Sequence, residues 1–157
     1  MGAVHSFSPP TYKQSDPLWG KEKFGFGERT FSQAGSLITS VSSMIAGTGS
    51  RINGEQSNPL TLNKYLLLNG GYVLKDNFVW GTIWRLGFRF QGKVRIAKEI
   101  VQEMKQGKFV ILCVNEGEHF VLATGYKEDA FTVMDPGPQD KLTYSFKEVV
   151  YGAVFTH

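Results

Sequence analysis

The sequence predicts an α+β fold in which N-terminal helices pack on a C-terminal antiparallel sheet. Before Gly107, apolar residues recur with helical spacing in three segments. After Gly107, they recur with strand spacing in segments joined by short polar turns. At 157 residues without an internal repeat, the chain is predicted to form one domain over residues 13–157, preceded by an extended arm over residues 1–12. Pro9 and Pro10 keep this arm out of helix and sheet.

The first predicted helix has the clearest signal. Its apolar residues form one stripe at i, i+1, i+4, i+7 and i+8: Leu37, Ile38, Val41, Met44 and Ile45. Gly47 and Gly49 close the helix, and Ser32 is its predicted N-cap, with Gly35 as the latest start. Both starts place Ser36 in the first turn, where unpaired backbone N–H groups and the helix dipole favour negative charge.

Two further helices have recognisable boundaries. The second begins with Asn58 as its cap and Pro59 at the first helical position, and it stops at residues 69–71. The third spans residues 95–106 and ends at Gly107. One side of the third helix is apolar and consists of Ile96, Ile100, Val101 and Met104.

Strands follow the third helix. They are predicted over residues 109–115, 119–126, 130–135, 142–145 and 152–156. A short helical turn is expected over residues 146–150. Because short polar turns join the first three strands, these are predicted to pair as antiparallel neighbours.

Composition and charge exclude several classes of function. The net charge of +3 comes without a clustered basic patch of the kind that binds nucleic acid, so no nucleic-acid partner is expected. No apolar run reaches the roughly 18 residues that a membrane span needs. The single cysteine, Cys113, permits neither an intrachain disulfide nor a cysteine-based zinc site, and no cofactor or metal is expected.

The N-terminal residues bear on location. Residues 1–10 lack the apolar core of a signal peptide, because they are small, polar and proline-ended. We therefore expect a cytoplasmic or phage-associated protein, and we expect it to be a monomer.

His119 is the strongest single candidate for a functional residue. The other histidines, His5 and His157, lie at or near the termini, where an organised site is not expected. A histidine that opens an otherwise apolar strand is more often structural. However, Ala123 and Gly125 share its predicted strand face and are small enough to let another element approach closely.

Asp135 ends the next predicted strand, so a hairpin can bring its carboxylate beside His119. There it would hold the imidazole in one tautomer and stabilise its cationic form. The alternative is that Asp135 only forms an Asx turn with the Pro-Gly-Pro segment after it. Asn115, which ends the preceding strand, is a second candidate for the orienting group.

Two residues compete for the role of nucleophile. Ser36 lies in the first turn of a helix, where a serine is usually a cap. Its hydroxyl, unlike a thiol, would need a general base to remove its proton. Cys113 lies in an apolar strand, and buried strand cysteines are generally inert.

Other residues could complete such a site. An oxyanion donor is needed, and the side-chain amides of Gln14 and Gln33 are both candidates. Four aromatic residues are predicted to belong mostly to the core and the wall of a cleft: Trp19, Tyr72, Trp80 and Trp84.

Taken in order along the chain, these segments resemble the double-glycine leader peptidase-like (bacteriocin-processing-like, family 39-like) cysteine peptidases of the papain-like clan. The resemblance covers most of residues 12–156. The segments that carry it are Gln14-Ser15-Asp16-Pro17-Leu18-Trp19, Gln33-Ala34-Gly35-Ser36-Leu37-Ile38-Thr39-Ser40, Asn69-Gly70-Gly71-Tyr72, Gly107-Lys108-Phe109-Val110, His119-Phe120-Val121-Leu122 and Asp135-Pro136.

The resemblance implies a papain-like domain that hydrolyses amide bonds in a peptide or peptidoglycan substrate. In that family the residue after the helix-entry glycine is the catalytic cysteine, and this position is Ser36. The family's histidine and acid match His119 and Asp135. Its oxyanion glutamine matches Gln14 first and Gln33 second.

Serine at the nucleophile position leaves three hypotheses open. The leading one is a cysteine-peptidase domain that is inactive because Ser36 replaces the thiol, whether by engineering or naturally. The second is a non-catalytic module that binds peptide or cell-wall fragments in a retained cleft. The third, ranked lowest, is a working serine hydrolase that uses Ser36, His119 and Asp135.

Overall fold

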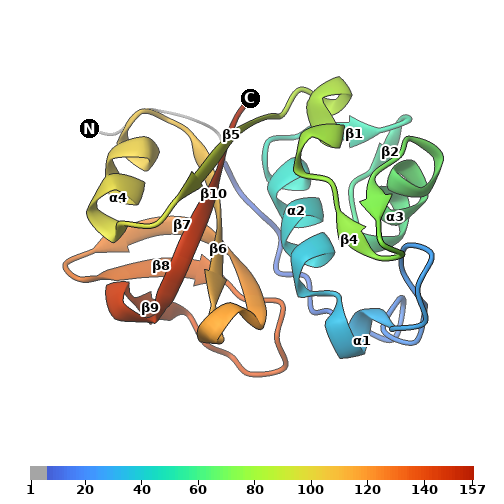
Figure 1. The fold of residues 1–157 in the computed structure, drawn as a ribbon, viewed down its shortest axis with the longest axis horizontal. Coiled ribbons are helices and arrows are strands. Elements are labelled where there is room, and N and C mark those ends of the chain that lie inside the picture. Colours follow the sequence, from blue (N-terminus) through green and yellow to red (C-terminus); the bar gives the residue numbers. More distant parts are fainter. Residues whose placement is uncertain (1–6) are drawn as a thin grey trace.

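The computed structural model of the chain describes residues 7–157; the first six residues of the predicted arm, with His5, lie outside the described part. Figure 1 shows two lobes, one built on a sheet and α4, the other on three helices and two small hairpins. The helices are α1 (Phe31–Ala34), α2 (Ser36–Gly47), α3 (Pro59–Leu68) and α4 (Ala97–Lys105), with 3₁₀ segments η1 (Trp80–Leu86), η2 (Asn115–Gly117) and η3 (Phe146–Glu148). The strands are β1 (Arg51–Ile52), β2 (Glu55–Gln56), β3 (Tyr72–Val73), β4 (Asn77–Phe78), β5 (Arg89–Val94), β6 (Phe109–Val114), β7 (His119–Lys127), β8 (Ala130–Met134), β9 (Thr143–Ser145) and β10 (Val149–Thr156).

The large sheet has six antiparallel strands in the order β5-β10-β6-β7-β8-β9. Every strand predicted after Gly107 is present, and the α+β class is confirmed. β5 was not predicted from the sequence, although it forms one edge of the sheet beside β10 (Figure 1). The two hairpins, β1–β2 and β3–β4, were also missed, since strands of two residues carry too little periodicity.

The sheet is covered on both faces. On one face, the core that includes α2 residues such as Met44 also takes in Ile111 of β6 and Leu122 of β7. On the other face, Ile100 of α4 packs with Leu112 and Val121. Because β6 is central and covered on both sides, all six of its residues are buried, as in strands that have no solvent face.

The start of the first predicted helix differs from the prediction. Thr30, not Ser32, caps a short helix α1, through a capping box in which its side chain accepts from the Gln33 amide. A second helix, α2, then begins after Gly35, which was predicted as the latest start. Gly35 is the N-cap of α2, but it makes no side-chain capping bond because glycine has no side chain. Ser36 therefore lies at the first position of α2, in the predicted first turn.

The later helices follow the predictions closely. Asn58 caps α3, accepting from the backbone amides of Leu60 and Thr61, and Pro59 stands at the first position. α4 is slightly shorter than predicted and begins at Ala97. The residues between the arm and α1 form turns, with one isolated β-bridge between Lys23 and Thr30.

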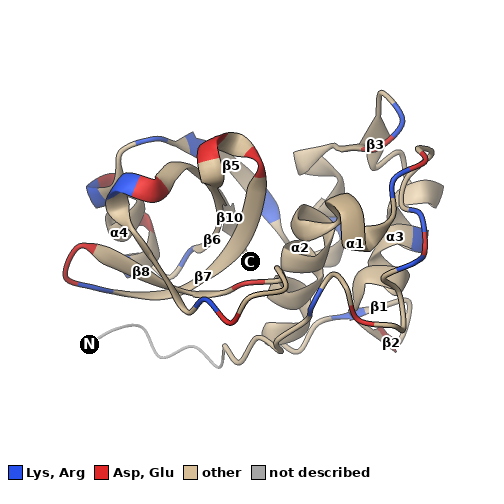
Figure 2. Cartoon of the chain, turned by 90° about the horizontal axis from the view of Figure 1, so that it is seen from below, with Lys and Arg blue, Asp and Glu red and all other residues tan. Residues whose placement is uncertain are grey.

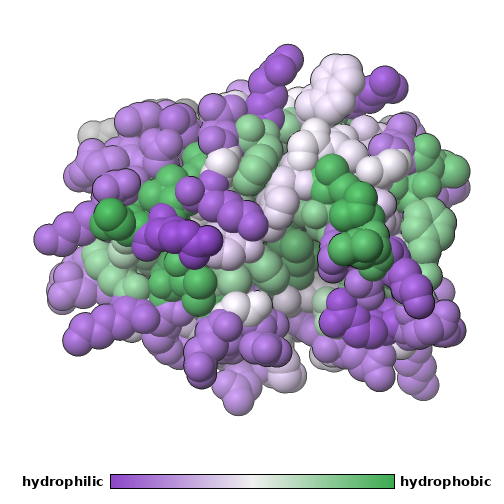
Figure 3. All heavy atoms as spheres, viewed as in Figure 1, coloured by the Kyte–Doolittle hydropathy of each residue, from purple (hydrophilic) through white to green (hydrophobic). Residues whose placement is uncertain are grey.

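Figure 2 shows α2 free of charged residues, whereas α4 carries several. On the face drawn in Figure 3, hydrophobic residues reach the surface in separate areas among polar ones. Among residues 7–157, the helices are too short or too polar for any of them to cross a bilayer.

The junction between α1 and α2 requires a residue without a side chain. A Cβ on Gly35 would lie 2.7 Å from the Cα and the carbonyl oxygen of Phe31. We expect Gly35→Ala to lower the free energy of unfolding by about 1–3 kcal/mol, because the added methyl group overpacks backbone that cannot move freely. Urea unfolding of the purified variant measures this.

Gly81→Ala is the matched control, because a Cβ there meets no atom within 4 Å. We expect its effect to stay within about 0.5 kcal/mol. Equal stability of the two variants would contradict the steric role of Gly35.

Candidate active site

The β7–β8 hairpin brings His119 and Asp135 together. His119 Nε2 lies 2.6 Å from Asp135 Oδ1, and the two side chains are 16% and 4% exposed. β7 begins at His119 and β8 ends at Met134, so the pair lies at the open end of the hairpin. The predicted pairing of these residues is thus what the structure shows, and Asn115, the second candidate, is not the partner of His119.

Asp135 is a buried carboxylate with three hydrogen-bond donors. Oδ1 accepts from His119 and from the Gly137 amide at 2.7 Å, and Oδ2 accepts from the Tyr144 hydroxyl at 2.7 Å. Burial alone would raise the pKa of Asp135, but these three donors outweigh it, so the pKa lies below its ordinary value. The carboxylate therefore stays ionised beside the imidazole.

Ser36 reaches the same site through the strand backbone. Its Oγ accepts a hydrogen bond of 3.1 Å from the amide of Phe120, the residue directly after His119. One turn along α2, Ser40 Oγ donates to the Phe120 carbonyl at 3.3 Å. Ser36 is therefore not a helix cap, and its hydroxyl is positioned against β7 from 84 residues away in the chain.

The sheet leaves the Phe120 peptide available to α2. β7 and β8 pair as far as Leu122 with Met134, and extending that register would set Phe120 opposite Pro136. Proline has no N–H to donate to the Phe120 carbonyl, and the Pro136 carbonyl already accepts from the backbone amide of Gln14, so pairing stops there. The two serines of α2 supply the partners that β8 cannot.

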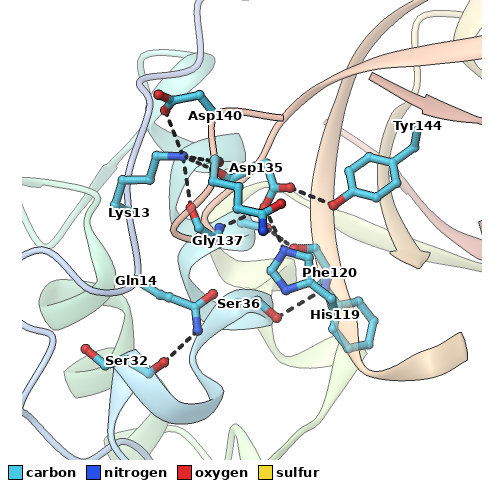
Figure 4. Close-up of polar contacts among 12 residues, drawn as sticks. Lys13, Gln14, Ser32, Ser36, His119, Phe120, Asp135, Gly137, Asp140 and Tyr144 are labelled. Atoms are coloured by element: carbon cyan, nitrogen blue, oxygen red, sulfur yellow. Dashed lines mark hydrogen bonds and ion pairs between the residues drawn. The ribbon is translucent and has the colours of Figure 1, made fainter. Parts of the chain in front are cut away.

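Figure 4 shows the His119 ring lying between Asp135 and Ser36. Because Nε2 is bound to Asp135, Nδ1 is the ring nitrogen left for a proton transfer at Ser36. The order hydroxyl, imidazole, carboxylate is the arrangement in which a base is oriented by an acid. The arrangement can therefore support nucleophilic attack assisted by a general base.

The two glutamine candidates differ in position. Gln14 is buried next to α1, and its Nε2 donates to the carbonyls of Phe31 and Ser32 at 3.2 and 3.1 Å. Its Oε1 is buried and has no hydrogen-bond partner among the described residues. Gln33 is exposed, and its Oε1 accepts from the Thr30 amide in the capping box of α1. Figure 4 shows the Gln14 amide near Ser36, but its Nε2 is bound to the two carbonyls and its unpartnered atom is an acceptor, so the oxyanion role of Gln14 stays a prediction.

The segment before Gln14 also holds the acid loop in place, which the sequence did not suggest. Lys13 Nζ donates to the carbonyls of Asp135, Gly137 and Gln139 at 2.9–3.1 Å. The backbone N–H of Gln14 donates to the carbonyl oxygen of Pro136 at 2.9 Å. Neither contact leaves a sequence signal, because backbone carbonyls of a distant loop are the acceptors. Tyr144 was missed for a related reason, since nothing in its strand distinguishes it from a core tyrosine.

Ser36 opens on a cleft of about 420 Å³. Its aromatic wall consists of Phe24, Phe78, Trp80, Phe120 and Tyr151, and its polar lining includes Arg29, Gln33, Asp76 and Glu118. Of the four predicted core and cleft aromatics, Trp19 and Tyr72 are buried in the core and Trp80 lines this cleft. Trp84 is 53% exposed and belongs to neither, because its 3₁₀ segment turns it outward.

The remaining candidates lie elsewhere. Cys113 is buried in β6, and burial raises the pKa of its thiol, as expected of a structural cysteine. His157 stacks on Phe88 with ring centroids 4.3 Å apart. Within residues 7–157, no group of three or more His, Cys, Asp or Glu side chains is arranged to hold a metal ion.

Comparison with known proteins identifies no relative: no protein-family model, no curated protein and no solved structure matches the chain. The site is therefore defined by its own geometry: a helix-borne hydroxyl on one cleft, and a strand-borne imidazole with its buried carboxylate on a neighbouring hollow, with Glu118 lining both.

The lowered pKa of Asp135 predicts a pH-dependent contribution to stability. A carboxylate whose pKa is depressed in the folded state stabilises the fold at pH values above its ordinary pKa of 3.8. This stabilisation is lost as the pH falls through the lower pKa that the carboxylate has in the folded protein. We expect Asp135→Asn to cost about 1.5–3 kcal/mol at pH 7, because it removes hydrogen bonds to a charged group. The difference should shrink near pH 2.

Urea unfolding at both pH values measures this difference. Asp140→Asn is the control on the same loop, since Asp140 is 98% exposed, and it should change little at either pH. A cost for Asp135→Asn that is the same at pH 7 and pH 2 would contradict the ionised state of Asp135.

Tyr144→Phe removes the donor to Asp135 Oδ2 and leaves that oxygen buried without a partner. We expect the pKa of Asp135 to rise, because one of the interactions that favour its charged form is lost. The ¹³C chemical shift of the labelled Asp135 carboxyl, followed against pH, reports this directly. Tyr126→Phe, on the exposed end of β7, should leave the titration unchanged.

Proposed function

We propose that the chain is a papain-like peptidase domain for amide bonds in a peptide or peptidoglycan substrate, with serine in place of the nucleophilic thiol. One observation carries the proposal: two hydrogen bonds bring the three residues together, one from the Phe120 amide, directly after His119, to Ser36 and one between His119 and Asp135. The resemblance of the sequence to the double-glycine leader peptidase-like family implies that the same three positions are nucleophile, base and acid.

A thiol at position 36 would have every support that its chemistry needs. The Phe120 amide points at the side-chain atom, and the α2 N-terminus, which has no acidic residue in its first turn, favours an anion. The thiolate attacks the substrate carbonyl, and His119, oriented by Asp135, gives its proton to the leaving amine. Water, deprotonated by His119, then releases the acyl group and restores the thiol.

The hydroxyl of Ser36 cannot follow this route as readily. A thiol near a helix N-terminus and a histidine ionises before attack, whereas a serine hydroxyl must lose its proton during the attack itself. The Ser36 chain is therefore proposed to bind substrate in the cleft and to hydrolyse it slowly or not at all. A non-catalytic module that holds peptide or wall fragments is the second candidate, favoured by the loss of the thiol while the cleft and the His119–Asp135 pair are kept.

We expect Ser36→Cys to gain hydrolysis of a fluorogenic peptide library or of purified peptidoglycan. Adding His119→Ala to that variant should lower kcat by about 10²–10⁴, the usual contribution of a general acid–base group. Product formation is followed by fluorescence and by mass spectrometry. Ser36→Ala and the unaltered chain are the matched controls.

The outcomes separate the candidates. Binding without hydrolysis in every variant would replace the peptidase proposal with the binding module. Turnover by the unaltered chain that Ser36→Ala abolishes would identify a serine hydrolase. Iodoacetamide labelling adds an independent reading: the thiol introduced by Ser36→Cys should react fast, whereas Cys113, the one native thiol, is buried and should react slowly.

A further inference from the structure

One stretch of the chain is strongly basic, and the proposed chemistry does not use it. Residues 77–98 contain five cationic side chains and no acidic one: Arg85, Arg89, Lys93, Arg95 and Lys98. Their summed charge exceeds the net charge of +3 of the whole chain. This stretch includes η1 and β5, the strand at the edge of the large sheet.

A β-bulge turns one of these cations, Lys93, toward two rings of the cleft wall. β5 pairs with β10 so that Lys93 faces Ala153 and Phe90 faces Phe155, with a register shift between Val154 and Phe155. Ala153 and Phe155 both belong to the core that packs on α2. Because the bulge adds a residue to β5, Phe90 and Lys93 share this face although they are three positions apart.

The ammonium of Lys93 lies between two rings that line the cleft. Its Nζ is 4.6 Å from the ring centroid of Tyr151 and 5.6 Å from that of Trp80. Arg95 approaches Tyr151 as well, with its Cζ 5.7 Å from the centroid. Both cations thus lie against Tyr151, a residue of the cleft wall, at the border of the cleft that Ser36 lines.

These cations have no carboxylate partner among the described residues. The acid groups that line the cleft are Asp76, which is bound to Arg29, and Glu118, which is exposed beside His119. The described ion pairs include neither Lys93 nor Arg95. Both side chains are exposed, so a bound ligand can reach them.

We infer that Lys93 and Arg95 form a subsite for a carboxylate of the bound peptide, which gives the cleft a preference for acidic substrates at one position. This inference rests on the proposed function in one respect, namely that the occupant of the cleft is a peptide. Cation–π contacts with the aromatic rings orient the two cations, and a carboxylate of the ligand would form the ion pair that the protein itself does not provide. Glu118 disfavours a carboxylate near His119, so the preference depends on position along the peptide.

The experiment is a positional scan of binding to the unaltered chain, whose Ser36 spares the probe from rapid cleavage. The probes are neutral octapeptides with a neutral fluorophore, in which each position in turn carries Glu or Gln. Fluorescence anisotropy gives the Kd of each Glu and Gln pair. We expect Glu to bind about twofold to fivefold more tightly than Gln at one or two adjacent positions, the size of a solvent-exposed ion pair.

Lys93→Gln and Arg95→Gln should each reduce this preference, and the double variant should abolish it. The matched control is Arg85→Gln: Arg85 is also exposed and also lies over a ring, at 5.1 Å from the Trp84 centroid, but Trp84 does not line the cleft. It should keep the preference. Raising the salt concentration should weaken the preference in the unaltered chain.

Equal binding of Glu and Gln at every position, or no binding of any peptide, overturns the inference. So does an equal loss with Arg85→Gln, which would indicate non-specific attraction. Self-association of the double variant with an unchanged Glu preference would mean that the cations only protect the free edge of β5.

The same scan distinguishes this inference from the proposed function. Hydrolysis by Ser36→Cys without a Glu preference rejects the subsite and keeps the peptidase. A Glu preference that Lys93→Gln removes, in a chain whose Ser36→Cys variant is inert, keeps the subsite and rejects the peptidase.

Discussion

The site depends on the hydrogen bonds between the peptide group of Phe120 and the two α2 serines, Ser36 and Ser40. Strand pairing does not satisfy this peptide group, because Pro136, the residue opposite beyond the end of β8, has no N–H to donate and its carbonyl already accepts from the Gln14 backbone amide. Buried backbone groups need partners, and Ser36 and Ser40 provide one each. Since these serines are one turn apart on α2, they fix both the height and the rotation of the helix against β7. The position of Ser36 beside His119 follows from that fit.

The loop after β8 carries the negative charge of the site, the carboxylate of Asp135. Asp135 is buried and ionised because its donors come from β7, from β9 and from its own turn, and these meet only when the sheet is assembled. The ammonium of Lys13 also stabilises this loop, because it donates hydrogen bonds to three backbone carbonyls of the loop. The geometry of the acid is thus a product of folding, and the stability of the fold in turn includes the stability of this ion.

The cleft combines groups from both lobes. The α1–α2 junction supplies the hydroxyl, and the aromatic wall comes from β4, η1, β7 and β10 together with Phe24 from the turns before α1. A bulge in the edge strand changes the direction of Lys93 without disturbing the core on either side. Local irregularities of backbone, at Gly35 and at this bulge, therefore direct side chains toward the cleft. Regular elements provide the frame that keeps them there.

The sequence determined the features that depend on short-range rules. Periodicity located α2 and the strands after Gly107, capping chemistry located α3, and a short hairpin was enough to pair His119 with Asp135. Only the tertiary structure decided how Ser36 meets Phe120, which donors surround Asp135, and which way Lys93 points. Ser32 was predicted as the cap although Thr30 and Gln33, three residues apart, form a capping box that the sequence itself contains. The contacts that only the tertiary structure decided join groups far apart in sequence, and their partners are defined by register and packing, which no local pattern encodes.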